Sequence, residues 1–311
     1  MRVGPTRESG KTKPAYRRRK PSLTAVRLDC AAAFQSIARD CTARIAAHHS
    51  SACAGDAEAV HQIRVAITRL RAAVSFFAPM TVDAEWLRLK KEIAWLNGSL
   101  GAARDTDVAV AYAGRRRYRT WARGTIGQDL DVRRLRDHRR LVRCLRSQRF
   151  RRLMEGLSDW IERGPWVARW KKAERRKPAE PLRSYSKQKL DRWHKRLIRK
   201  GRRLKTMGAS RRHRLRIHAK RLRYMLEVLT DIVPVSVHGE FRRLHRPAKC
   251  LQRVLGDLRD LERFSRLGAG SLPPEGGKQG NLRPPGYRRQ EEKLLVAAVE
   301  AYRGLKPVEA R

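Results

Sequence analysis

Acidic residues, paired cysteines and long apolar runs are all scarce in this 311-residue sequence. Only 30 side chains are Asp or Glu, against 74 Lys and Arg, so the formal net charge at pH 7 is +44. The five cysteines are odd in number, far apart and never in a CxxC pair, which favours a reducing, cytoplasmic compartment and argues against a zinc site. No run of about 18 apolar residues occurs, and the basic N-terminus leads into no apolar segment, so we expect neither a membrane span nor a secretory signal.

So large a positive excess opposes compact folding through self-repulsion unless a polyanion neutralises it. Hydrophobic residues still make up 41% of the chain, which is enough for a core, so we expect a folded basic protein rather than a disordered tail. The excess of Lys and Arg over Asp and Glu excludes a protein with the surface of an ordinary metabolic enzyme. It leaves three classes of partner open: nucleic acid, an anionic membrane surface and polymers of phosphate.

The predicted fold class is all-α. Apolar residues recur at spacings of three and four, and no alternating strand pattern of useful length appears. We expect helices at about 22–47 (capped by Ser22), 57–77, 83–100, 104–113, 129–147, 149–162, 184–206, 210–231, 238–255, 257–267 and 287–303. Residues 1–21 are predicted to be a flexible basic arm, 163–183 a linker and 268–286 a Gly/Pro-rich loop.

The sequence contains an internal repeat, which divides it into a first unit at 22–162 and a second at 184–304. The segment His61–Arg71 matches His213–Arg223 in the pattern H-x-[IL]-R-[VI]-x-x-[TK]-R-L-R, at an offset of 152 residues. Farther along, the Leu-Gly-x-x-Arg-Asp segments that begin at Leu100 and Leu255 match at an offset of 155 residues. Two matches in the same order and at nearly the same offset indicate two copies of one helical unit.

Placed on a helix, each copy of the first motif separates into an apolar face and a basic face. The predicted core positions are Ile63, Ile67, Leu70, Val74 and Phe77 in the first copy, and Leu215, Ala219, Leu222, Leu226 and Leu229 in the second. The basic faces consist of His61, Arg64, Thr68 and Arg71, and of His213, Arg216, Lys220 and Arg223. Over three turns such a face extends about 15 Å, which suits a linear anion with repeating charge.

Simpler explanations exist for each of these features. A basic helix face is most often just solvated, although solvation alone does not require the same spacing in two halves. The two histidines are either structural groups or anion contacts, and the sequence leaves both open. Arg104-Asp105 and Arg259-Asp260 are predicted to begin new helices, where the Asp stabilises the first turn or orients a neighbouring cation. Trp86, Trp95 and Trp193 are predicted core residues.

At these motifs the sequence resembles the CHAD family, named for conserved histidines in an α-helical domain, from about Ser22 to Arg303. The resemblance implies two helical bundles related by a pseudo-twofold, facing one another across a basic groove that binds inorganic polyphosphate. It implies groove positions for His61, Arg64, Arg71, His213, Arg216, Lys220 and Arg223, and further candidates at Lys90, Lys91, Arg243 and Arg246.

Two departures from the family pattern bear on function. Thr68 stands where the second copy has Lys220, so we expect weaker anion binding by the first half. Family members are often fused to a triphosphate tunnel enzyme with an E-x-E-x-K strand, and that motif is absent here.

The leading hypothesis is therefore a non-catalytic polyphosphate-binding protein, without cofactor or metal, that targets or organises polyphosphate granules. One alternative is a nucleic-acid-binding protein. The bulk charge supports it, but the sequence contains no helix-turn-helix, zinc knuckle or array of stacking aromatic residues. The other alternative is a polyphosphate-processing enzyme. An enzyme would need catalytic or metal-binding groups, and the only repeated acids are Asp105, Asp107, Asp260 and Glu262.

Overall fold

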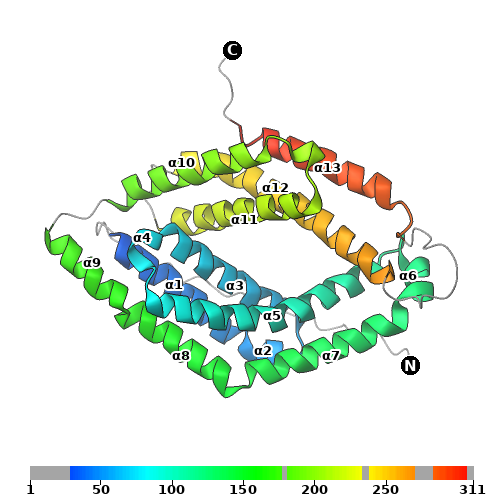
Figure 1. Ribbon diagram of the computed structural model, residues 1–311, viewed down its shortest axis with the longest axis horizontal. Helices are drawn as coiled ribbons and strands as arrows, with labels where there is room; N and C mark the ends of the chain where they lie inside the picture. Colours follow the sequence, from blue (N-terminus) through cyan, green and yellow to red (C-terminus); the bar gives the residue numbers. More distant parts are fainter. Residues whose placement is uncertain (1–28, 177–180, 233–237, 270–282, 307–311) are drawn as a thin grey trace, which may run out of the picture.

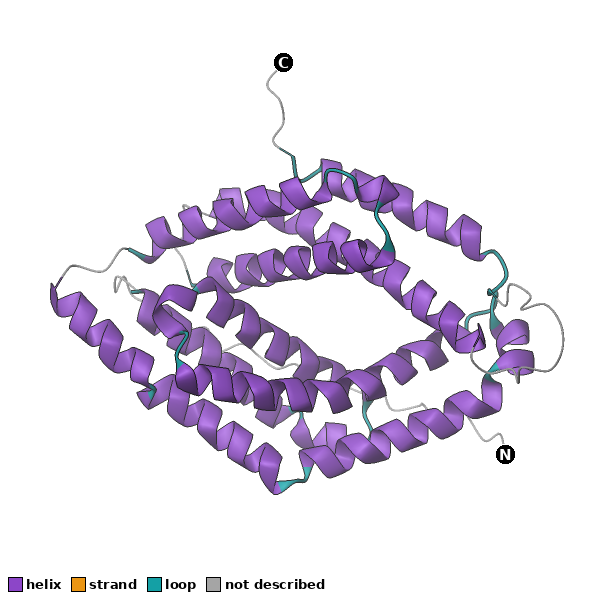
Figure 2. Ribbon diagram, viewed as in Figure 1, coloured by secondary structure: helices purple, strands orange, loops and turns teal. Residues whose placement is uncertain are grey.

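The computed structural model describes residues 29–176, 181–232, 238–269 and 283–306, and every regular element within these ranges is a helix (Figure 2). The all-α prediction is therefore confirmed for the described part of the chain. The predicted arm at 1–21, the Ser22 cap and most of the predicted 268–286 loop lie outside the described residues.

The first part of the chain forms nine helices among the described residues. Their bounds are α1 (Cys30–Ala47), α2 (His49–Cys53), α3 (Ala57–Phe76), α4 (Ala78–Thr81), α5 (Ala84–Ala113), α6 (Arg119–Thr125), α7 (Gly127–Leu145), α8 (Gln148–Arg163) and α9 (Pro165–Arg176). The second part forms α10 (Leu182–Gly201), a short 3-10 helix (Leu204–Thr206), α11 (Ala209–Thr230), α12 (His238–Ala269) and α13 (Tyr287–Arg303).

Aspartates fix where three of the long helices begin. Asp29 Oδ1 accepts a hydrogen bond from the Ala32 amide at 2.6 Å at the start of α1. Asp56 and Asp83 cap α3 and α5 in the same way. Each cap satisfies an amide that the first helical turn leaves without a partner.

Two predicted helix breaks are wrong. The predicted break at Gly101 does not occur, because α5 runs through it as one helix of 30 residues. Likewise α12 passes through Gly256 and contains Pro247. Arg104-Asp105 and Arg259-Asp260 consequently lie inside helices rather than at their starts. Much of the predicted linker at 163–183 is also helical, since it contains α9.

Four helices form an inner, four-sided frame (Figure 1). In it α3 packs against α5 and α11, and α12 packs against α11 and α5. The helices α7, α8 and α9 lie along one outer side of this frame, and α10 and α13 lie along the opposite one. The two helices that carry the first motif, α3 and α11, therefore meet each other inside the molecule, as do the two that carry the Leu-Gly segments.

The core positions predicted from the motif helices are confirmed. Ile63, Leu70, Leu222 and Leu226 are fully buried, and the six other predicted positions on α3 and α11 are at most 2% exposed. Burying an aliphatic side chain of this size stabilises the fold by about 1.5–3 kcal/mol, so these two faces anchor the frame. None of the helices in the described ranges is both long and apolar enough to traverse a bilayer.

Candidate functional site

Half-buried basic side chains from all four frame helices gather where these helices meet. We call this set the cationic cluster: His61 and Arg64 on α3, Arg104 on α5, His213, Arg216 and Lys220 on α11, and Arg259 and Arg263 on α12. The charges of its members act on one another across helix boundaries. The pKa of Arg64, for example, is lowered mainly by burial and further by the charges of Arg263, Arg104 and Arg216. A dense set of cations with restricted access to water is typical of a site for a multivalent anion.

In the α3–α5 part, the glycine of the first Leu-Gly pair brings the motif arginine close to the helix backbone. Arg64 Nη1 donates a hydrogen bond to the Leu100 carbonyl at 3.0 Å. A Cβ atom on Gly101 would lie 3.4 Å from the same nitrogen. Burial, followed by the charge of Arg104, lowers the pKa of His61 beside it, so the imidazole is held neutral.

The α11–α12 part repeats this arrangement. A Cβ atom on Gly256 would lie 3.3 Å from Arg216 Nε, so both Leu-Gly pairs leave room for a motif arginine. Arg259 Nη1 donates a hydrogen bond to His213 Nδ1 at 2.7 Å. Burial, followed by the charge of Arg259, lowers the pKa of His213. A neutral imidazole can accept this bond whereas an imidazolium cannot, so His213 orients Arg259.

Lys220 is the most strongly perturbed member of the cluster. Its Nζ donates a hydrogen bond to Thr68 Oγ1 on α3 at 3.2 Å. Burial, followed by the charges of Arg216 and Arg64, lowers the pKa of this amine to about 7. Arg216 Nε is buried as well and has no hydrogen-bond partner among the described residues. The cluster thus holds a suppressed charge and an unused donor, and a bound anion would satisfy both.

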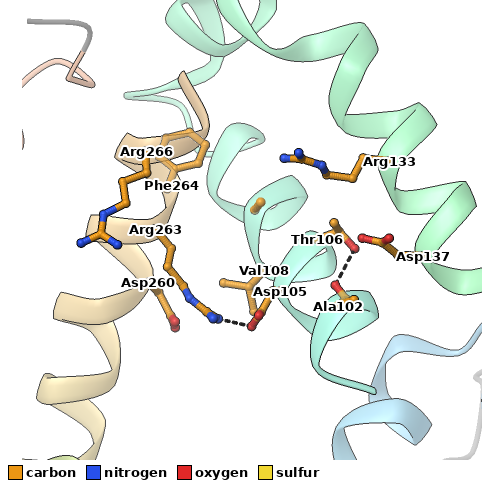
Figure 3. A pocket seen from close by; sticks show the side chains of 11 residues that line it. Ala102, Asp105, Thr106, Val108, Arg133, Asp137, Asp260, Arg263, Phe264 and Arg266 are labelled. Carbon is orange, nitrogen blue, oxygen red and sulfur yellow. Dashed lines mark hydrogen bonds and ion pairs between the residues drawn. The ribbon is translucent and has the colours of Figure 1, made fainter. Parts of the chain in front are cut away.

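Carboxylates, among them Asp105 and Asp260, oppose the six Lys and Arg side chains of the cluster. Asp105 on α5 forms an ion pair with Arg263 on α12, which joins the two helices (Figure 3). Burial raises the pKa of Asp260, although the charge of Arg216 acts in the opposite direction. Beside this pair lies a cavity of about 270 Å³ between α5, α7 and α12, lined among others by Arg133, Arg266 and Phe264 (Figure 3). Positive charge remains in excess.

The other two repeated acids lie outside the cluster. Asp107 is only 8% exposed and bonds to Arg134 and His138 of α7, at 3.0 and 2.9 Å. Glu262 pairs with Arg266 one turn farther along α12. Asp105 and Asp260 thus line one cavity beside the cluster, whereas Asp107 and Glu262 are bonded elsewhere. Among the described residues no group of three or more His, Cys, Asp or Glu side chains is arranged to hold a metal ion.

The structure brings together five of the residues predicted for the groove: His61, Arg64, His213, Arg216 and Lys220. Arg223 borders them, since its charge acts on Lys220 while its guanidinium lies 4.3 Å from the Tyr224 ring centroid and 3.2 Å from Glu227. Arg71 is exposed and acts instead on Arg221. The remaining four, Lys90, Lys91, Arg243 and Arg246, are exposed and form no ion pair with another described residue.

Three members of the cluster were missed as site residues by the sequence analysis. Arg104 and Arg259 recur at the same offset as the Leu-Gly pairs, and this repetition was the available signal. They were assigned to helix starts because a mid-helix glycine resembles a break. Arg263 had no such signal, because Val108 stands at the matching position of the first half.

Comparisons with known proteins agree with this picture. The CHAD domain family model matches residues 36–267. A crystal structure of the CHAD domain from the plant Ricinus communis superposes with a TM-score of 0.69 at 25% identity, covering 93% of this chain and 96% of the plant chain. PptA from Streptomyces chartreusis shares the fold, with a TM-score of 0.63 at 14% identity over 89% of this chain and 100% of its own. No curated protein sequence matches significantly. The family model matches most of the chain, and the two Leu-Gly segments and both motif histidines lie at one cluster. The chain therefore belongs to the CHAD domain family.

Proposed function

We propose that this protein binds inorganic polyphosphate in the cationic cluster, without catalysing its turnover, and that this binding targets it to polyphosphate granules in the cytoplasm. The observation that carries the proposal is Lys220, whose amine is surrounded by Arg64, Arg216, Arg223 and Arg259 and has its pKa lowered to about 7. Such an arrangement is costly without an anion and favourable with one. The association of the CHAD family with polyphosphate supports the same ligand.

The position of the cluster favours a thin phosphate chain over nucleic acid. Its members are half-buried between helices rather than spread over an exposed face. A double helix presents its phosphates around a wide cylinder, whereas polyphosphate carries no sugars or bases and can enter between side chains. Arg64, Arg216 and Arg259 supply the planar donor groups that bind phosphate oxygens in pairs.

We further propose that the two sequence repeats face each other across this site as a basic groove. Thr68 and Lys220 occupy the same position in the two motif copies, and they contact each other directly. A pseudo-twofold passing between α3 and α11 would produce such a contact. The parallel placement of Arg64 against Gly101 and of Arg216 against Gly256 supports the same relationship.

A non-catalytic role is supported by the partners that three of the four repeated acids already have. Metal-assisted phosphoryl transfer uses carboxylates that converge on one or two ions. Here Asp105 is already paired with Arg263, and Asp107 and Glu262 bond elsewhere. We therefore expect no release of phosphate from polyphosphate with Mg²⁺ or Mn²⁺.

The test is equilibrium binding of long-chain polyphosphate and of duplex DNA with the same number of phosphates, at about 0.15 M salt. We expect tighter binding of polyphosphate. Equal affinity for DNA would contradict the proposal and favour the nucleic-acid alternative. In cells, a fluorescent fusion should colocalise with polyphosphate granules and disperse when polyphosphate is removed. A signal that stays with the nucleic acid would contradict the proposed localisation.

A further inference from the structure

A second concentration of positive charge lies where α10 packs along α11, on the outer side of the frame (Figure 1). Lys189, Arg196 and Lys200 share one face of α10, at positions i, i+7 and i+11. This face extends over roughly 16 Å. These three residues, together with His218 and Arg221 of α11 and Arg71 of α3, form a set that we call the outer stripe.

The members of the outer stripe lie close enough to act on one another electrostatically. Burial, followed by the charges of Lys200, Arg221 and Arg196, lowers the pKa of His218 to about 4. The charges of Arg71 and Arg196 similarly act on Arg221. The consecutive helices α10 and α11 and the distant helix α3 thus bring their cations together. The outer stripe is distinct from the cationic cluster, because His218 and Arg221 project from another side of α11 than Arg216 and Lys220.

No carboxylate balances this surface within the described part of the chain. Arg71, Arg196, Lys200 and Arg221 form no hydrogen bond or ion pair with another described residue, and every charged group that shifts the pKa of His218 is a cation. Elsewhere on the surface arginines do find acids, as in the pairs Arg39–Glu162 and Arg149–Glu92. Like charges one turn apart, such as Arg196 and Lys200, repel each other, so a bound polyanion would stabilise the stripe.

We propose that the outer stripe is a second binding segment for polyphosphate, and that one long chain contacts both the stripe and the cationic cluster. This inference rests on the proposed function. Arg71 supports a connection between the two, because it belongs to the motif helix α3 yet faces Arg221. The aromatic side chains of α10 are engaged in the core: Trp193 packs edge-on against Phe76 at 5.4 Å, and Tyr185 stacks on Phe77 at 5.6 Å. The stripe therefore offers phosphate contacts without the stacking surface that single-stranded nucleic acid uses.

The experiment compares three double variants with the unmodified protein. Arg196→Gln with Lys200→Gln alters two exposed members of the stripe. Arg64→Ala with Arg216→Ala alters the cationic cluster. Arg152→Gln with Lys172→Gln removes one Arg and one Lys from exposed positions on α8 and α9 and serves as the charge-matched control. Arg71→Gln tests the stripe from a different helix. Thermal unfolding verifies that each variant is folded.

Two ligands separate the sites: long-chain polyphosphate, and tripolyphosphate, which has only three phosphates. For the stripe variant we expect about three- to tenfold weaker binding of the long chain, with unchanged binding of tripolyphosphate to the cluster. The slope of log K against log salt should become shallower by about 1 to 2, since each neutralised phosphate contributes about 0.9 in duplex DNA. A bound chain should also raise the pKa of His218. NMR titration measures this pKa, and the His218→Asn variant assigns the resonance.

The outcomes distinguish this inference from the proposed function. If the stripe variant and Arg71→Gln bind polyphosphate as the charge control does while the cluster variant loses binding, the inference about the outer stripe is wrong and the proposed function stands. If the unmodified protein does not bind polyphosphate, or if the cluster variant matches the control, the proposed function fails and this inference fails with it. A loss of single-stranded RNA binding without loss of polyphosphate binding would assign the stripe to nucleic acid and overturn the inference.

Discussion

Arg259 donates a hydrogen bond to His213 across 2.7 Å, from α12 to α11. The equivalent residues of the first half, Arg104 and His61, also act on each other, because the charge of Arg104 lowers the pKa of His61. In both halves the histidine of the motif is therefore a neutral group beside an arginine rather than an additional cation. In the second half the hydrogen bond to His213 also orients Arg259.

Acid pH should destabilise the protein through these histidines. The pKa values of His61, His213 and His218 are all lowered by burial and neighbouring cations, the last to about 4. The unfolded chain then binds more protons than the folded one, so stability falls as the pH drops below about 6.5. Denaturant unfolding between pH 7.5 and 5 measures this, and His218→Asn should flatten the dependence. A stability that rises toward pH 5 would contradict the placement of these side chains.

Removal of the two cluster arginines should abolish most binding. In Arg64→Ala with Arg216→Ala the cluster loses one bidentate phosphate donor from each half, so we expect polyphosphate affinity to fall by a factor on the order of 100. Arg151→Ala with Arg152→Ala on α8 is the control, since both side chains are exposed there. Isothermal titration calorimetry measures both. Equal losses would mean that bulk charge rather than the cluster binds the ligand.

Lys220→Met should change stability and binding in opposite directions. The folded protein holds this amine at a pKa of about 7, so at neutral pH it resists a proton that the unfolded chain binds readily. Replacing it with an apolar side chain of similar length should stabilise the free protein by about 1–3 kcal/mol. The same change should weaken polyphosphate binding.

Proton uptake provides an independent check on Lys220. A bound anion favours the charged amine, so binding near pH 7.5 should take up protons. Titrations in buffers with different ionisation enthalpies should reveal this uptake in the unmodified protein, and it should largely disappear in Lys220→Met. Uptake of the same size in the variant would show that another group is responsible.

The glycines of the Leu-Gly pairs should matter for binding rather than for helix stability. Gly101→Ala and Gly256→Ala place a Cβ at 3.4 and 3.3 Å from nitrogens of Arg64 and Arg216, so the added methyl group packs directly against these guanidinium groups and restricts their positions. We expect severalfold weaker polyphosphate binding. Gly98→Ala on the same helix α5 is the control, because no atom lies within 4 Å of its Cβ position. That variant should gain about 0.5–1 kcal/mol of stability and bind normally. Weaker binding in all three variants would point to a general effect of stiffening the helices.

The apolar faces of the motif helices should control stability. Leu70→Ala and Leu222→Ala each remove a fully buried side chain and should cost about 2–5 kcal/mol. Leu87→Ala on α5 provides the comparison, since Leu87 is 51% exposed. Chemical denaturation measures all three. A cost below about 1 kcal/mol at Leu70 would contradict its place in the core.

The sequence by itself determined the helical class, the core faces of α3 and α11 and most of the residues at their meeting point. Those features follow from local periodicity and from the repeated motif, which are both visible in one dimension. The span Tyr287–Arg303 of α13 was predicted to the residue, because a Gly/Pro-rich segment precedes it and Gly304 follows.

Only the tertiary structure decided which cations face which. A glycine inside a helix looks locally like a terminus, and only the packing of Arg64 on Gly101 and of Arg216 on Gly256 shows what a small residue at these helical positions accommodates. The placement of Arg104, Arg259 and Arg263 in the cluster, and of Arg71 on the outer stripe, depends on how four helices cross. Packing between distant segments sets that crossing, and it also determines which charges are buried together and how far their pKa values move.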